Sequence, residues 1–224
     1  MPLDTEYYLP PLTAYLRAHG LPADADGIAS AKERGLKPHR FKRAGELPRV
    51  RRVLGALAGL APTDLLDIGT GRGAFLWPLM DRFPALPVTC VDPLEHRVEL
   101  LQRVRDGGIG HLTPLVGDVT ALPFPDAAFD GATVLEVLEH LPKPERAVAE
   151  LLRVARRFVV ASVPVVMDSS PSPVRWIKSA RSPRTCATRQ HCSTSSAGAT
   201  RATRRACRSR CPITRAPSPA TFAG

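Results

Sequence analysis

Short apolar runs alternate with amphipathic stretches from residue 65 to residue 163, and this alternation restricts the fold more than any other feature of the chain. The apolar runs predict strands and the stretches between them predict helices. Such an alternation favours an α/β fold, in which a parallel sheet carries helices on both faces and the crossovers are right-handed. The predicted strands are Leu65–Ile68, Val88–Val91, Leu112–Val116, Gly131–Leu135 and Phe158–Val163, and the predicted helices are Leu47–Leu60, Ala74–Phe83, Glu95–Arg105 and Glu145–Ala155.

The net charge of +10 comes from the last quarter of the 224 residues. Residues 1–168 carry 20 Lys and Arg against 21 Asp and Glu, whereas residues 169–224 carry 10 Arg, one Lys and no acid. A nucleic-acid surface needs basic residues on folded structure, so the charge does not favour a nucleic-acid partner. The longest apolar run is far shorter than the ~20 residues of a membrane helix. With Cys90 as the one cysteine before the tail, a reduced, cytoplasmic compartment is expected.

A glycine-rich turn follows the first predicted strand and carries the strongest signal for a ligand site. Its residues, Asp67-Ile-Gly69-Thr70-Gly71-Arg-Gly73, allow a sharp backbone turn and the close approach of a ligand. A helix predicted from Ala74 would present free N–H groups beside it. Alone, this turn also resembles a dinucleotide fingerprint, so a nicotinamide-dependent dehydrogenase is the competing interpretation.

Three later features separate the two interpretations. Asp92 ends the second strand, where a carboxylate can accept both hydroxyls of a ribose. Asp118 follows the third strand, and the fourth strand runs into Leu135, Glu136 and the segment around His140. The motifs LLDIGTGRG, VTCVD, GDVTALPF and FDGATVLEVLEHLP, in this order and spacing, resemble the class I S-adenosylmethionine-dependent methyltransferases over about 100 residues. A dehydrogenase would explain Asp92 but not the last two motifs.

The resemblance implies a fold, a cofactor and a set of site residues. The implied fold is the family's Rossmann-like sheet, whose usual strand order is 3-2-1-4-5-7-6 with strand 7 antiparallel. The implied cofactor is S-adenosylmethionine. Its methionine part would contact Asp67, Gly69, Thr70, Gly71 and Gly73, its ribose Asp92 with Pro93 alongside, its adenine Asp118 and Val119, and its sulfonium Leu135 and Glu136.

The activity implied by the resemblance is methyl transfer to a hydroxyl or amine of a small-molecule acceptor. Such a transfer needs an aligned nucleophile and exclusion of water, and a hydroxyl also needs a base or a metal. Glu136 and His140 are the candidate catalytic residues. The spacing of Glu136, Glu139 and His140 predicts one face of a helical turn, where they could hold Mg²⁺. The alternative is that His140 caps the turn or acts as a metal-free base.

Two further functions stay open at this point. The Glu-x-x-Glu-His pattern is also similar to that of metal-dependent RNA 2′-O-methyltransferases. A chain without the family's C-terminal elements would instead be a remnant that binds the cofactor without activity.

The N-terminal 45 residues are expected to form a helical cap that precedes a methyltransferase domain over residues 46–167. Apolar positions between Tyr7 and Leu16 recur at helical spacing and predict a short helix. The basic run Lys37–Arg43 is interpreted as a solvated loop, with a phosphate or substrate contact as the alternative.

Residues 168–224 are expected to form a basic, disordered tail. From residue 169 onward there is no Leu, no acid and no hydrophobic period, a composition that cannot bury a core. Strands 6 and 7 of the family are therefore expected to be absent, which would leave Phe158–Val163 as an exposed apolar edge. A shifted reading frame of GC-rich codons would yield this composition; the alternative is a genuine basic arm for RNA or membrane phosphates.

Overall fold

Five parallel strands form the centre of the fold, as the alternation in the sequence predicted. The computed structural model describes residues 3–43, 47–163 and 174–177, all within a unit that spans Met1–Ser182. The first strand lies between the second and the fourth, so the direction of the strand order reverses at its end. In sheets of this kind ligands bind at that reversal, outside the carboxyl ends of the strands. In spatial order the parallel strands are β3 (Leu112–Val116), β2 (Val88–Asp92), β1 (Leu65–Ile68), β4 (Phe129–Leu135) and β5 (Ala155–Ser162).

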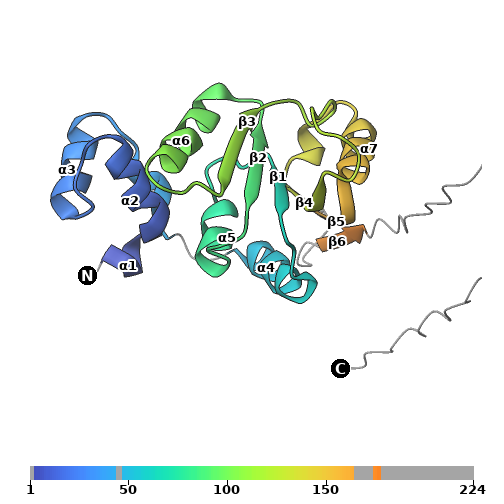
Figure 1. Cartoon of the computed structure of the whole chain (residues 1–224), viewed down its shortest axis with the longest axis horizontal. Coiled ribbons are helices and arrows are strands. Elements are labelled where there is room, and N and C mark those ends of the chain that lie inside the picture. Colours follow the sequence, from blue (N-terminus) through green and yellow to red (C-terminus); the bar gives the residue numbers. More distant parts are fainter. Residues whose placement is uncertain (1–2, 44–46, 164–173, 178–224) are drawn as a thin grey trace, which may run out of the picture. The chain divides into compact units, whose positions relative to one another are not determined.

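Helices cover both faces of the sheet, which confirms the Rossmann-like α/β class. Side chains along β1 alternate between two core clusters: Leu65 packs with helices α4 and α5, and Leu66 packs with α7. Figure 1 shows α7 beside β4 and β5, and α6 at the opposite end beside β2 and β3. Within the described ranges, no helix combines the length and the apolar character needed to cross a bilayer. The helices around the sheet are α4 (Pro48–Leu60), α5 (Leu76–Arg82), α6 (Glu95–Asp106) and α7 (Pro144–Val154).

Helix α5 begins two residues later than predicted, and a proline explains the difference. Trp77 N donates to Gly73 O, and Leu79 N donates to Phe75 O. Pro78 lies between these donors and has no N–H, so the carbonyl of Ala74 receives no helical hydrogen bond. Regular helix therefore starts at Leu76 and leaves the segment after Gly73 as irregular backbone.

The N-terminal segment packs against the end of the sheet that carries α6. It forms α1 (Leu3–Glu6), α2 (Leu9–Ala18), α3 (Ala25–Glu33) and the short 3₁₀ helix η1 (Pro38–Phe41). Helix α2 contacts α6 (Figure 1). The approach is close at Gly107, where a Cβ would collide with the carbonyl of Ala14. The predicted helix between Tyr7 and Leu16 thus corresponds to α2.

The expectation that β5 is an exposed edge strand is wrong. Strand β6 (Val174–Ile177) pairs antiparallel with β5, with Val159 opposite Ile177 and Ser162 opposite Val174. It occupies the place beside strand 5 that the family gives to its antiparallel strand. The rest of the predicted tail, residues 168–173 and 178–224, lies outside the described residues, as does the predicted absence of a further strand.

Candidate functional site

A cavity of about 500 Å³ opens at the carboxyl ends of β1, β2 and β4. This volume lies within the range of about 300–1,000 Å³ that is usual for small-molecule sites. The cavity lies at the reversal of strand order, where α/β sheets bind their ligands. Most of the sequence-predicted site residues line it, namely Asp67, Gly69, Thr70, Gly71, Asp92, Pro93, Leu135, Glu136 and His140.

Three glycines of the turn after β1 adopt backbone conformations that other residues rarely adopt. Gly69, Gly71 and Gly73 have φ values of 69°, 59° and 82°, all in the left-handed region. Gly69 and Gly73 also have no room for a Cβ, which would collide with the side chain of Val137 and with the indole of Trp77. Gly73 lies beside the cavity wall rather than in it, so the structure gives it a role in shaping the turn.

Asp67 is a buried carboxyl at the end of β1, with 2% of its surface exposed. It accepts hydrogen bonds from the hydroxyls of Thr133 (2.8 Å) and Thr70 (3.1 Å). Burial raises the pKa of Asp67 to about 7, although the two threonine hydrogen bonds act in the opposite direction. A cation placed in the cavity would favour the ionised form of Asp67. The part of the cavity beside Asp67 is therefore suited to a positively charged group.

Asp92 is completely buried at the end of β2 and holds the turn in place. Its Oδ2 accepts from the backbone N–H of Gly71 and from Arg97, both at 3.2 Å, and its Oδ1 accepts from the N–H of Leu94 at 3.0 Å. The Arg97 side chain is one-third exposed, so its guanidinium can move into solvent and stay hydrated there. Asp92 is therefore an acceptor that ligand hydroxyls can share.

The structure does not group Glu136, Glu139 and His140 as the predicted magnesium cluster requires. Glu136 has a positive φ of 55°, and the 3₁₀ helix η2 (Leu138–His140) starts after it. The reversed backbone at Glu136 breaks the helical spacing that would have aligned the three side chains. Across residues 3–43, 47–163 and 174–177, no three His, Cys, Asp or Glu side chains are grouped so that they could hold a metal ion.

Glu136 is instead tied to the neighbouring strand. Its backbone N–H donates to Ser162 O at 2.9 Å, and the Ser162 hydroxyl donates to Glu136 Oε1 at 3.1 Å. Arg49 Nε lies 3.8 Å from the same carboxylate oxygen. A positive φ in a non-glycine residue is uncommon and occurs often at functional sites. His140 lines the cavity from the end of η2, whereas Glu139 is exposed and is not part of the described lining.

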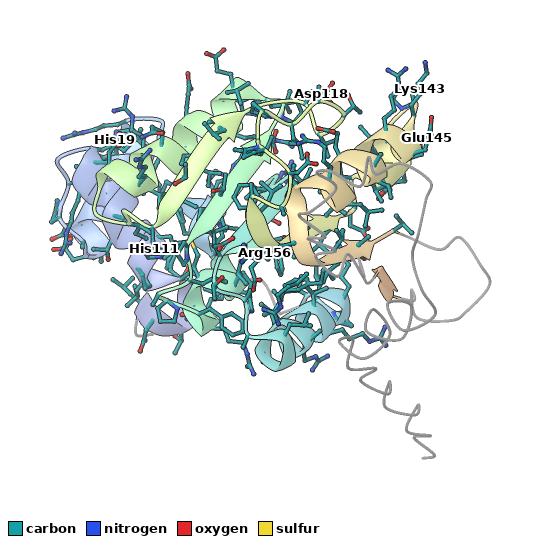
Figure 2. All side chains as sticks on the ribbon, turned by 45° about the vertical axis from the view of Figure 1, so that its right-hand side comes forward. His19, His111, Asp118, Lys143, Glu145 and Arg156 are labelled. Atoms are coloured by element: carbon teal, nitrogen blue, oxygen red, sulfur yellow. The ribbon has the colours of Figure 1, made fainter. Side chains whose placement is uncertain are left out.

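Asp118 and Val119 do not reach the cavity within the described structure. Asp118 lies on the exposed loop after β3 (Figure 2) and accepts from the N–H and the hydroxyl of Thr120, both at 2.8 Å. These hydrogen bonds lower the pKa of Asp118. Val119 packs in the core cluster that contains Leu66 and α7. The predicted adenine contacts of these two residues therefore do not follow from the structure.

Several lining residues carried no sequence signal. Arg97 lies five residues after Asp92 and could have been suggested by helical position alone. Ile68 and Arg72 lie within the glycine-rich turn motif but had no role assigned. The others come from α4 and the residue before it, the segment before α5, and the residues on either side of η2. The lining residues that the sequence did not suggest are Leu47, Arg49, Val50, Ile68, Arg72, Ala74, Phe75, Arg97, Val137 and Leu141.

Comparisons with known proteins show that part of the chain is similar to methyltransferases. Residues 66–158 match the profile of a family described as "Methyltransferase domain". The malonyl-[acyl-carrier protein] O-methyltransferase of Geobacter sulfurreducens is 32% identical over 133 residues, which are 58% of this chain and 49% of the relative. The demethylmenaquinone methyltransferase of Thermus thermophilus is 32% identical over 117 residues, or 51% and 53% of the two chains.

A solved structure is similar over about half of the chain. The crystal structure of the [4+2]-cyclase SpnF is 27% identical, covers 50% of this chain and 44% of that chain, and superposes with a TM-score of 0.44. The chain spans about half the length of the curated relatives it matches.

Proposed function

We propose that the chain transfers a methyl group from S-adenosylmethionine to a hydroxyl or amine of a small molecule. The match of residues 66–158 to the profile described as "Methyltransferase domain" supports the proposal. The observation that carries it is the cavity at the strand ends, which joins the glycine turn to two buried carboxyl groups. The activities for which the relatives are named, O-methylation of malonyl-[acyl-carrier protein] and methylation of demethylmenaquinone, are those of other proteins.

The residues of the cavity fit the chemistry of this cofactor. Asp67 provides a buried carboxyl for the ammonium group of the methionine part. Asp92 provides acceptors for the ribose hydroxyls once Arg97 turns outward. Apolar side chains, among them Ile68 and Phe75, provide the surface for the flat base. When bound, S-adenosylmethionine supplies a methyl group on a cationic sulfur.

Glu136 and His140 are proposed to act at the acceptor side of the cavity. Ser162 and Arg49 fix the Glu136 carboxylate, which makes it a rigid wall beside the reacting groups. His140 lines the same cavity and is proposed as the base for an acceptor hydroxyl. Without a metal cluster in the described residues, the metal-dependent RNA methyltransferase loses the feature that favoured it.

Calorimetric titration of the full chain with S-adenosylmethionine tests cofactor binding. We expect binding of S-adenosylmethionine and none of NAD, the ligand of the competing dehydrogenase. Asp92→Asn should weaken binding by tenfold or more, because a hydrogen bond to a charged group contributes about 1.5–3 kcal/mol. Thermal unfolding of the variant shows whether the buried site stays folded.

Asp106→Asn is the matched control. Asp106 is the last residue of α6 and is exposed, and it accepts a hydrogen bond from the side-chain amide of Gln102. Equal affinities of both variants would contradict the assignment of Asp92. Transfer of a radiolabelled methyl group to a panel of small hydroxyl and amine acceptors tests the activity. Binding without transfer to any acceptor would favour the inactive remnant instead.

A further inference from the structure

A second cavity of about 410 Å³ lies beside the first, between η1 and α5. The two cavities share the lining residues Leu47, Arg72 and Ala74. The cavity assigned to the cofactor and the neighbouring space therefore adjoin at these residues. An acceptor must lie next to the cofactor for in-line transfer, and this neighbouring space meets that requirement.

The lining of the second cavity is basic. Five of the described lining residues are Lys, Arg or His and none is Asp or Glu; the five are Lys37, His39, Arg40, Lys42 and Arg72. Lys42 pairs with Glu6 at 2.7 Å. In the part of the chain that the structure describes, no acid forms an ion pair with Lys37, Arg40 or Arg72.

Aromatic residues form the wall beneath these cations. Trp77 and Tyr8 line the cavity and are 2% and 7% exposed. The guanidinium of Arg43 lies over the Tyr8 ring, 4.4 Å from its centroid, so both rings contribute only a small exposed area. The rest of the apolar wall comes from Leu47, Ala74 and Pro78. A ligand that matches both features has an aromatic or apolar body with an anionic group at one end.

The basic segment is held in a fixed conformation. The indole of Trp77 donates to Arg40 O at 3.0 Å, and the Trp77 and Phe41 rings pack with centroids 5.0 Å apart. Phe41 is fully buried, and its carbonyl accepts from the N–H of Tyr8 at 2.9 Å. The run Lys37–Arg43 therefore contains the 3₁₀ helix η1, which is anchored on α5. Its Lys37, His39, Lys42 and Arg43 are exposed, as predicted for a solvated segment, but the backbone is held in place.

From this geometry we infer that the second cavity binds the methyl acceptor, and that the acceptor is a small molecule with an aromatic or apolar body and an anionic group. The inference rests on the proposed function and names the substrate class of the same site. Lys37, Arg40 and Arg72 bind the anionic group, and the apolar lining residues beside them receive the body. Leu47, Arg72 and Ala74 line both cavities, so an acceptor anchored in the second cavity extends into the first, where Glu136 and His140 lie.

The test compares two phenols that differ only in charge, 4-hydroxyphenylacetate and 4-hydroxyphenylacetamide. Ligand-detected NMR measures the dissociation constant of each with the full chain, in the presence and absence of S-adenosylhomocysteine. We expect the carboxylate to bind at least fivefold more tightly than the amide. The double variant Lys37→Gln/Arg40→Gln should remove most of that preference, since each exposed ion pair contributes up to about a fivefold factor, and 0.5 M salt should weaken it in the wild type.

Arg34→Gln is the matched control, because Arg34 is an exposed cation at the end of α3 outside both cavities. It should leave the preference unchanged. Equal binding of the two phenols, or the same loss in the control, would overturn the inference. A short single-stranded RNA that binds with the same dependence on Lys37 and Arg40, while the phenols are not distinguished, would also overturn it.

Failure of this inference is separable from failure of the proposed function. Titration with S-adenosylmethionine reports the first cavity, to which neither Lys37 nor Arg40 contributes. Intact cofactor binding with no preference between the phenols rejects the acceptor class alone. Absence of cofactor binding rejects the proposed function, whatever the phenols do.

Discussion

Asp67 is expected to make the protein less stable as the pH rises, and Asp67→Asn should remove this effect. The pKa of the buried carboxyl is raised from 3.8 to about 7, so the folded state binds the proton more tightly than the unfolded chain does. The contribution of Asp67 to stability is then fully present below about pH 4, the pKa of the carboxyl in the unfolded chain. It decreases as the pH rises and is lost above about pH 7, where the carboxyl is ionised in the folded state as well.

The size of the effect follows from the two pKa values. They differ by about three pH units, and each unit corresponds to ~1.4 kcal/mol, so ionised Asp67 costs roughly 4 kcal/mol of unfolding free energy. An amide fits the same contacts. Thr70 can donate to its oxygen, while Thr133, which lies 3.3 Å from Leu66 O, can donate there and accept from the amide nitrogen. A gain of roughly 4 kcal/mol would raise the melting temperature at pH 8 by on the order of 10 °C.

Urea unfolding followed by circular dichroism between pH 4.5 and pH 8 measures the effect. The wild type should lose stability across this range relative to Asp67→Asn. Asp118→Asn is the control: Asp118 is exposed and its pKa is lowered by Thr120, so its contribution is present above the unfolded pKa and is lost only as the pH falls through the folded value. Parallel pH profiles for the wild type and Asp67→Asn would refute the argument from burial.

Three further substitutions probe the turn, the sheet and the acceptor side. Gly73→Ala should destabilise the protein by more than 1 kcal/mol, measured by urea unfolding, because it strains a left-handed φ and drives a Cβ into Trp77. Asp130→Asn should also destabilise it in the same assay, and more at low salt than at high salt, because Asp130 is buried and pairs with two arginines at the start of β5. His140→Ala should reduce methyl transfer at least tenfold in a radiolabel assay while leaving the calorimetric affinity for S-adenosylmethionine within twofold.

The five parallel strands could be predicted to within a few residues because burial on both faces requires apolar residues, which form recognisable runs in the sequence. Leu65 and Leu66 are both fully buried, on opposite faces of the sheet, and a strand covered on both faces becomes a continuous apolar run. Strand β6 had no such signal. Val174–Ile177 is four residues long and follows a stretch of Ser and Pro, so the composition of the surrounding tail concealed it.

The ion pairs of the arginines after α7 also could not be predicted from the sequence. Arg156 and Arg157 follow the predicted helix and would be expected to favour its C-terminal dipole in solvent. In the structure they lie in β5, since the strand starts directly after α7, and both pair with Asp130. Arg156 is labelled in Figure 2. Such pairs join residues far apart in the sequence, which spacing cannot reveal.

The candidate site was predicted where each residue sits at a strand end, and missed where the backbone departs from a regular pattern. Asp67 and Asp92 end neighbouring parallel strands, which must bring them to one edge of the sheet. Glu136 directly follows β4, and it combines a positive φ with hydrogen bonds to Ser162 of β5, a residue far from it in the sequence. Helical spacing therefore gave the wrong geometry for Glu139 and His140.

The two cavities differ in the balance of charge in their described linings. The first contains three carboxyl groups, Asp67, Asp92 and Glu136, and three arginines, Arg49, Arg72 and Arg97, and Asp67 and Asp92 are the buried members of this set. The second has cations without acids. A cationic sulfonium fits the buried carboxyl groups of the first, and an anionic acceptor fits the cations of the second. The charge pattern therefore supports both proposals in one geometry, in which Leu47, Arg72 and Ala74 line both cavities.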